Sequence, residues 1–289
     1  MLNTLKSWFA TLVAAAVALP VAVWTHGRLD ALNGVAGAPL VLADDPTGSL
    51  VAALVAAVCF LVIAVVVGRL TNRTLALFLY GVGWTFVAYR SMSLDQAVRL
   101  MTEADLGFSR TSLLLAAEVL FWSVPVLILA VALARFVPRG EGESDQARPF
   151  APISLLGAGL TFVGCLVLGW LFMRTDLIGQ AVFGFAAATA LSVMIVRLVW
   201  PRANTITIVV APLAAGIIGH VLGALVMGDR ALVLTTAGDA WALSRAMPMV
   251  YAGSGTLGIA LGVWLGRMFG PEGQAEAREA MANPTGRTT

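Results

Sequence analysis

The chain has 289 residues, of which 59% are hydrophobic and only 12% are charged, and its mean hydropathy is +0.89. These values exclude an ordinary soluble domain and indicate an integral membrane protein. A formal net charge of +2 is no signature of nucleic-acid binding. Cys59 and Cys165 both fall inside apolar runs without a CxxC or Cys/His cluster, so no metal site is predicted.

Four apolar runs in the first half of the chain predict membrane helices, at residues 8–24, 50–68, 74–89 and 111–136. A polar loop of residues 25–49 separates the first two runs. Between the third and the fourth, Ser93 and Gln96 form a capping-box pattern, and Gly107 is a stop signal. Apolar residues follow that cap at helical spacing, namely Leu94, Ala97, Val98 and Met101. The pattern predicts a short amphipathic helix at the membrane surface, at residues 94–106.

The second half repeats this order, with apolar runs at residues 152–173, 179–200, 205–227 and 247–269. A polar connection of residues 228–246 takes the place of the surface helix. The sequence therefore predicts an all-α protein with eight transmembrane helices. We expect a first membrane unit at 1–150, including a cytoplasmic linker at 137–150, a second unit at 151–269 and a disordered cytoplasmic tail at 270–289.

Repeated landmarks indicate that the two halves are copies of one four-helix unit. The stretch Trp24-Thr25-His26-Gly27-Arg28-Leu29-Asp30 recurs as Trp170-Leu171-Phe172-Met173-Arg174-Thr175-Asp176, with Trp, Arg and Asp at the same spacing. Arg69-Leu70 and Arg197-Leu198 close the next runs, and Ser109-Arg110 and Ser244-Arg245 precede the last run of each half. Because each unit crosses the membrane an even number of times, the repeats are predicted to be parallel.

Eleven of the 18 Lys and Arg residues fall on the side of the two termini and seven on the other. The positive-inside rule then places both termini in the cytoplasm, and we expect a bacterial cytoplasmic membrane. Both Trp-x-x-x-Arg-x-Asp stretches, Arg110 and Arg245 lie on the outer side in this topology. They are either interfacial anchors and solvated pairs, or part of an electropositive region for an anionic solute, a lipid headgroup or an acidic partner.

Glu118 is the only acidic residue well inside a predicted span. Ionisable groups in a membrane are costly and commonly functional. We expect Glu118 to line an outward-facing polar cavity, bordered by a stretch that contains Ser254 and Thr256 and overlooked by Arg110 and Arg245. Three alternatives are open: the carboxyl group of Glu118 is neutral, it is hydrogen bonded to a neighbouring hydroxyl group, or it is paired with Arg110.

Small residues in the last span, Gly258, Gly262 and Gly266, recur every four residues and predict close helix packing. The expected partner is the preceding span, which has similar spacing at Ala215, Gly219 and Gly223, and homodimerisation is the alternative. His220 lies in that preceding span, where a structural hydrogen bond is the simpler role. Haem held by His26 and His220 remains an alternative, and no other cofactor is predicted.

No HExxH, Gly-x-Ser-x-Gly or acidic-cluster motif is present, so catalysis is disfavoured. Three classes of function remain: a transporter or channel-like protein for a small or anionic solute, an accessory or scaffold subunit of a larger membrane complex, and a haem-binding electron-transfer subunit. The expected partners are membrane lipids and a second copy or a larger membrane complex, and nucleic acid is not expected.

Overall fold

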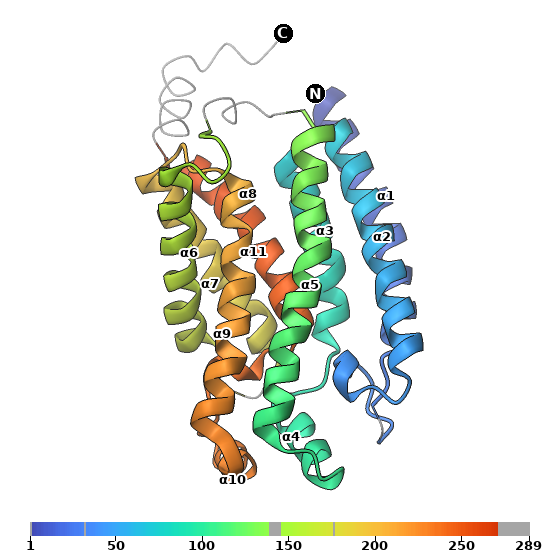
Figure 1. Cartoon of the computed structure of the whole chain (residues 1–289). Coiled ribbons are helices and arrows are strands. Elements are labelled where there is room, and N and C mark those ends of the chain that lie inside the picture. Colours follow the sequence, from blue (N-terminus) through green and yellow to red (C-terminus); the bar gives the residue numbers. More distant parts are fainter. Residues whose placement is uncertain (1, 32, 139–145, 176, 271–289) are drawn as a thin grey trace.

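The computed structural model describes residues 2–31, 33–138, 146–175 and 177–270, and this part of the chain is helical, without a β-strand. Eight helices of 17 to 29 residues form a bundle (Figure 1). The first half contributes α1 (Leu2–His26), α2 (Pro46–Leu70), α3 (Arg73–Tyr89) and α5 (Phe108–Phe136). The second half contributes α6 (Pro152–Phe172), α7 (Ile178–Val199), α9 (Val210–Met227) and α11 (Pro248–Phe269).

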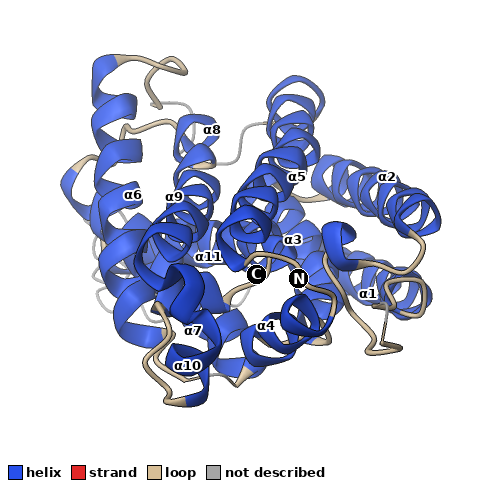
Figure 2. Cartoon of the chain, turned by 60° about the horizontal axis from the view of Figure 1, so that its bottom comes forward, coloured by secondary structure: helices blue, strands red, loops and turns tan. Residues whose placement is uncertain are grey.

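Short helices lie in the connections between the long ones. They are η1 (Leu40–Leu42), α4 (Leu94–Glu103), α8 (Thr205–Ile208), η2 (Gly228–Arg230), α10 (Ala231–Thr236) and η3 (Ala242–Arg245). The beginning of α1 and the end of α11 lie at the same end of the bundle, which we call the upper end (Figure 1). The loop that contains η1 lies at the opposite, lower end, and α4 and α10 lie across that end (Figure 2). The predicted tail, apart from Gly270, lies outside the described residues.

Six helical segments of the described chain are long and apolar enough to cross a membrane: α2, α5, α6, α7, the continuous stretch Thr205–Thr236, and α11. The chain is therefore a multi-pass membrane protein. The two remaining long helices, α1 and α3, do not have a described apolar stretch of that length. α3 has 17 residues, and the described apolar part of α1 is Thr11–His26.

The short amphipathic helix α4 and its capping box form as the sequence predicts. Ser93 accepts a hydrogen bond from the backbone N–H of Gln96, whose side chain accepts one from the N–H of Ser93. The prediction was wrong about Gly107, because α4 ends at Glu103 and Gly107 is the N-cap of α5. The chain turns instead at Asp105, which has a φ of 55°, a left-handed conformation that Asp tolerates better than most residues.

The most buried of the six segments is α11, and its glycines set its closest contacts. A Cβ atom on Gly258 would lie 2.5 Å from the carbonyl oxygen of Ala186, and one on Gly262 would lie 2.5 Å from that of Ala190. Both carbonyl groups belong to α7. The expected partner, the preceding span α9, was therefore wrong, because the missing side chains let the backbone of α7 approach.

The glycines of α9 serve a different contact from the one we expected. Gly219 faces Leu243 and the hydroxyl group of Tyr251, and Gly223 faces Ser244. They make room for η3 and the first turn of α11. The stretch 253–256 of α11 remains helical, and Thr256 donates a hydrogen bond to the carbonyl group of Ala252 one turn earlier. This part of α11 is thus a packed helix, not an unwound one.

Candidate functional site

A pocket of about 200 Å³ opens at the lower end of the second half. We call it the lower pocket. Its wall combines the end of α6, the end of α9 and the turn that leads from α10 into η3. The residues that define its chemistry are Trp170, Arg174, Asp239, Trp241 and Arg245. Three of them, Trp170, Arg174 and Arg245, are residues that the sequence singled out.

Arg245 organises the turn that forms one side of the lower pocket. Its guanidinium group is buried and donates hydrogen bonds to the carbonyl oxygens of Gly238, at 2.8 Å, and Ala240, at 3.3 Å. Gly238 has a φ of 78°, a left-handed conformation that suits glycine. Bonds from one planar group to two carbonyl groups hold the turn in shape, because the guanidinium donors have a fixed geometry. Arg245 therefore lies inside the pocket wall rather than above a cavity in the middle of the protein.

Arg174 and Trp170 form the opposite side of the lower pocket. The guanidinium carbon of Arg174 lies 4.7 Å from the ring centroid of Trp170, which is a cation–π contact. Trp170 lies in the last turn of α6 and Arg174 two residues beyond the end of that helix. Asp176, the last member of this copy of the motif, lies outside the described residues.

The first copy of the motif makes different contacts from the second. The carbonyl oxygen of Arg28 accepts a hydrogen bond from the Ser49 hydroxyl group at 2.7 Å, and that of Asp30 accepts one from the N–H of Asp44 at 2.9 Å. Trp24 is 45% exposed. The first copy therefore forms the base of the loop between α1 and α2, and the duplicated motif has two different environments.

Trp241 supplies a donor that the sequence analysis overlooked. Its indole Nε1 is buried and has no hydrogen-bond partner within the described residues. A buried N–H group without an acceptor is costly, so such a group commonly marks a place for an unseen partner. A tryptophan in a polar connection, four residues before an arginine, was the signal that could have revealed it. Asp239 is exposed and contributes a carboxylate to the same pocket.

Glu118 lies in a packed seam, in contrast to the cavity that we expected. Its Oε2 accepts a hydrogen bond from the N–H of Val41 at 3.3 Å, and its Oε1 accepts one from the indole N–H of Trp122 at 3.2 Å. The carboxyl group is 4% exposed. It thus fastens η1 to α5, and its polar atoms are satisfied by the protein itself.

The stretch of α11 that was expected to border Glu118 is separated from it by aromatic rings. The rings of Trp122 and Trp84 contact each other at a centroid distance of 5.1 Å and an interplanar angle of 54°. A Cβ atom on Gly253 would lie 2.8 Å from the backbone of Trp84. Ser254 is fully buried, and its hydroxyl group has no hydrogen-bond partner within the described residues. Arg110 is exposed in the first turn of α5.

The two histidines have separate environments. His26 lies at the end of α1, with its Nε2 3.0 Å from the carbonyl oxygen of Arg90. His220 is fully buried in α9, where its ring lies edge-on to Tyr251 at 5.8 Å, and neither of its ring nitrogens has a hydrogen-bond partner among the described residues. The two imidazoles therefore belong to different helices and have different polar environments.

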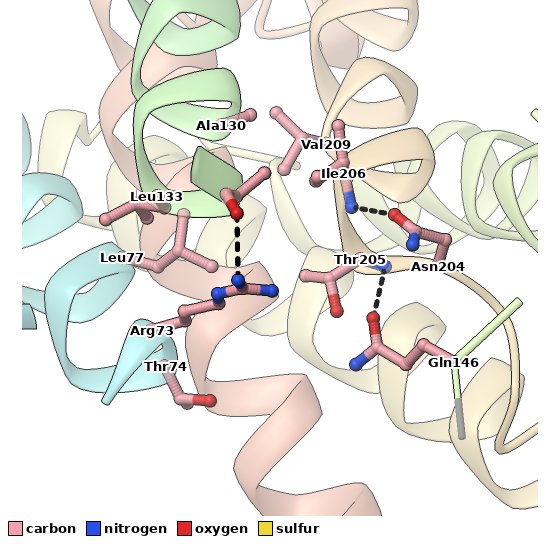
Figure 3. A pocket seen from close by; sticks show the side chains of 11 residues that line it. Arg73, Thr74, Leu77, Ala130, Leu133, Gln146, Asn204, Thr205, Ile206 and Val209 are labelled. Atoms are coloured by element: carbon pink, nitrogen blue, oxygen red, sulfur yellow. Dashed lines mark hydrogen bonds between the residues drawn. The ribbon is translucent and has the colours of Figure 1, made fainter. Parts of the chain in front are cut away.

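A second polar pocket lies near the upper end, between α3, α5 and α8, and the sequence analysis did not predict it (Figure 3). Arg73 donates hydrogen bonds to the carbonyl oxygens of Ala134 and Val137, at the end of α5. Asn204 donates to the carbonyl group of Ala147, and Gln146 accepts from the N–H of Thr205. The remaining space is about 40 Å³, enough for a few water molecules. These polar groups tie the helix ends together.

The lower pocket is therefore the place where the tertiary structure gathers the largest number of predicted site residues. Its lining includes two arginines and two tryptophans, and the indole N–H of Trp241 is buried without an acceptor in the described chain. Such groups recognise a negatively charged oxygen. Comparisons of the chain with models of known protein families, with curated proteins and with solved structures give no match.

Proposed function

We propose that this protein is a membrane transport protein whose lower pocket is an outward-facing site for a small anionic solute. The observation that supports the proposal best is Trp241, which lines the same pocket as Arg174 and Arg245 and whose buried indole N–H lacks an acceptor among the described residues. A carboxylate or phosphate oxygen is an acceptor that the Arg174 guanidinium group and the Trp241 indole N–H suit, while Arg245 holds the turn beside them through its bonds to Gly238 and Ala240.

The lining of the lower pocket limits the charge and size of this solute. Arg174, Arg245 and Asp239 give the described lining a formal charge of +1, which suits a monoanion. The volume of about 200 Å³ suits a small molecule. The rings of Trp170 and Trp241 offer apolar faces, so a carboxylate on a short hydrocarbon group fits the pocket better than a strongly hydrated inorganic ion.

The proposal includes eight spans, with the lower end outside the cell. Ideal geometry gives α3 a length of about 26 Å and α1 a length of about 38 Å, close to or above the hydrocarbon thickness of about 30 Å. Among the described residues, the upper end has no Asp or Glu and contains Arg69, Arg73, Arg135, Arg148, Arg197, Arg202 and Arg267. The positive-inside rule counts only Lys and Arg, and over the whole chain eleven of the 18 fall on the side of the upper end and seven on the other side in this topology. The positive-inside rule then places the upper end, and both termini, in the cytoplasm.

We also propose that the units at 1–150 and 151–269 are parallel repeats. The proposed repeat pairs α1 with α6, α2 with α7, α3 with α9 and α5 with α11. The helix contacts fit this pairing, because α1 packs on α2 and α3, as α6 packs on α7 and α9. Likewise, α3 packs on α11, as α9 packs on α5. Arg69 bonds to the end of α5, and Arg197 contacts Gly266 near the end of α11. In each half, the second helix thus meets the end of the last.

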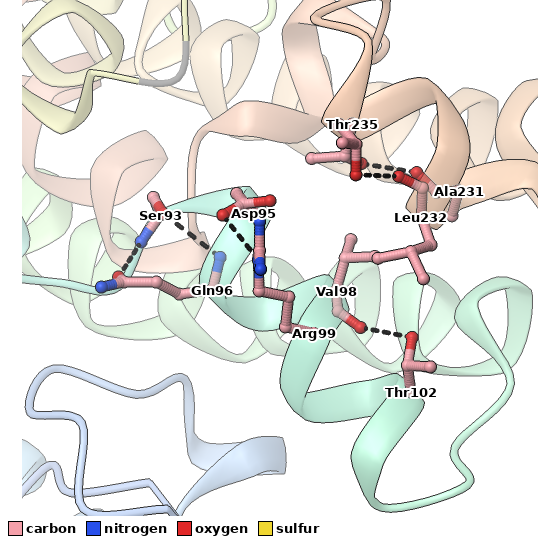
Figure 4. Close-up of polar contacts among 10 residues, drawn as sticks. Ser93, Asp95, Gln96, Val98, Arg99, Thr102, Ala231, Leu232 and Thr235 are labelled. Atoms are coloured by element: carbon pink, nitrogen blue, oxygen red, sulfur yellow. Dashed lines mark hydrogen bonds and ion pairs between the residues drawn. The ribbon is translucent and has the colours of Figure 1, made fainter.

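The surface helices support the same pairing. α4 and α10 precede the last long helix of their halves, and they pack against each other (Figure 4). α5 and α11 also pack against each other. If the two halves are related by an axis along the membrane normal, an element beside that axis contacts its own counterpart in the other half. The axis would then lie between α5 and α11 and between α4 and α10.

A second candidate function, an accessory or scaffold subunit, is favoured by the environment of Glu118. Its carboxyl group joins η1 to α5 and so serves the structure of the protein. Close glycine contacts between α7 and α11 also favour a rigid core. The lower pocket would then bind an acidic group of a partner protein or of a lipid at the outer surface.

Anion titrations followed by thermal unfolding test the proposed site. Sodium acetate, sodium butyrate and sodium phosphate are compared with sodium chloride at equal ionic strength, using purified protein in detergent. A ligand that binds only the folded state raises the Tm in a concentration-dependent way. We expect the largest rise with butyrate, a loss of the rise in Trp241→Phe and a weaker rise in Arg174→Gln.

Arg110→Gln is the matched control, because Arg110 is an exposed arginine at the same end that does not line the pocket. An equal response of all three variants and the wild type would contradict an anion site in the lower pocket. Flux of labelled butyrate into proteoliposomes then separates the two functions. Binding without flux would favour the accessory subunit over the transporter.

A further inference from the structure

A second opening, distinct from the lower pocket, lies between the first turns of α3 and the last turns of α11. We call it the α3–α11 groove, and it has a volume of about 410 Å³. Its lining includes Asn72, Thr74, Phe78, Leu261, Trp264 and Arg267. No part of the proposed function uses this groove.

The lining of the α3–α11 groove is layered along the bundle. α3 runs away from the upper end, so Phe78 lies about 9 Å below Asn72. α11 runs toward the upper end, so Leu261 lies about 9 Å below Arg267. The polar residues Asn72, Thr74 and Arg267 thus share the level of the helix ends, and the apolar residues lie deeper. A polar rim above an apolar floor matches an amphiphilic molecule that is oriented like a membrane lipid.

The position and charge of the groove indicate which lipid it suits. Trp264 is 53% exposed, although α11 is the most buried of the six candidate spans, so its ring lies on the outer surface of the bundle. The described part of the upper end contains arginines and no acidic residue. Basic pockets between membrane helices bind anionic headgroups, and the apolar floor disfavours a free anion.

The α3–α11 groove is open, whereas the other polar pocket at the upper end is filled by side chains of the protein. There, Arg73 bonds to the carbonyl groups that end α5, and Gln146 covers the start of α8. The protein's own side chains therefore fill that junction almost completely, leaving about 40 Å³ against about 410 Å³ in the α3–α11 groove. Thr74 lies in the first turn of α3, where backbone N–H groups have no acceptor within the helix.

We infer that the α3–α11 groove binds an anionic phospholipid of the leaflet at the upper end. Arg267 and Thr74 contact its phosphate group, and Phe78, Leu261 and Trp264 contact its acyl chain. The lipid would fasten the start of α3 to the end of α11. These two helices belong to different halves of the chain, so the bound lipid would stabilise the contact between the halves.

Native mass spectrometry of the full chain, purified and delipidated in detergent, tests this inference. The probes are phosphatidylglycerol, phosphatidylcholine with the same acyl chains, and inorganic phosphate. We expect phosphatidylglycerol to bind preferentially and Arg267→Gln to weaken it about tenfold, the loss of one charge-assisted hydrogen bond. Arg135→Gln is the matched control, because it removes an exposed arginine from the end of α5, outside the groove.

Thr74→Val tests the same site without a change of charge, and it keeps the inference testable if Arg267→Gln does not fold. It should weaken phosphatidylglycerol binding by a smaller factor and leave phosphatidylcholine binding unchanged. Equal retention of the two lipids by the wild type would overturn the inference. So would equal effects of Arg267→Gln and Arg135→Gln, or competition by inorganic phosphate at millimolar concentration, which would indicate a site for a free anion.

Discussion

Gly262→Ala should destabilise the bundle, although alanine is the better helix former. A Cβ atom at this position would lie 2.5 Å from the carbonyl oxygen of Ala190 and 2.6 Å from the Cβ of Val193. Carbon atoms pack best at about 3.5–4.0 Å, so α7 would have to move by roughly 1 Å. Both obstructing atoms belong to or adjoin the backbone of α7, and a change of rotamer cannot relieve the contact.

The magnitude follows from a comparison with Gly159→Ala on α6, where a Cβ atom would meet nothing within 4 Å. Replacing glycine in a helix by alanine stabilises both variants by about 1 kcal/mol. Overpacking costs about 1–3 kcal/mol, and only Gly262→Ala bears this cost. The free energies of unfolding of the two variants should therefore differ by about 1–3 kcal/mol, with Gly159→Ala the more stable.

Unfolding by sodium dodecyl sulfate in mixed micelles, followed by circular dichroism, gives these free energies. The difference between the two variants is the quantity to compare, because the gain in helix propensity is common to both. If Gly262→Ala proves as stable as Gly159→Ala, the helices α7 and α11 are not in close contact at this point.

Three further predictions concern the topology and the lower end. In a background without the native cysteines, a cysteine at Glu103 should react with an impermeant maleimide from outside the cell and one at Arg202 should not; the reverse pattern would invert the proposed orientation. Glu118→Ala should leave two buried donors unsatisfied and cost about 1–3 kcal/mol. It should also speed hydrogen exchange at residues 40–42, and an unchanged exchange rate there would contradict this. Ser93→Ala should cost about 1 kcal/mol and speed exchange in α4 alone, whereas a uniform change along the chain would argue against a local cap.

The membrane helices could be predicted closely from the sequence because their signal is local. A long apolar run must form its backbone hydrogen bonds internally when it enters a membrane, so each run becomes a helix. The predicted run at 152–173 became Pro152–Phe172, and the run at 179–200 became Ile178–Val199. The capping box at Ser93 is local in the same sense, since the two residues that form it lie three positions apart.

The partners of these helices could not be predicted in the same way. A small-residue pattern, such as that of Gly258 and Gly262, shows that another backbone approaches but not which one. Sequence neighbours were the simplest choice, and α9 was the wrong partner. In the structure α7 packs on α11, because the order of helices around α11 depends on every connection in the chain.

The composition and hydropathy of this sequence were sufficient to place it in a membrane, to position its helices and to single out Trp170, Arg174, Glu118 and Arg245. Only the tertiary structure decided what these residues do, because burial and hydrogen bonding depend on segments far apart in the chain. Glu118 accepts a hydrogen bond from the N–H of Val41, 77 residues away, and is buried there instead of lining the expected cavity. Arg174 and Arg245, 71 positions apart in the sequence, share one pocket because the ends of α6 and α9 and the turn before η3 converge at the lower end.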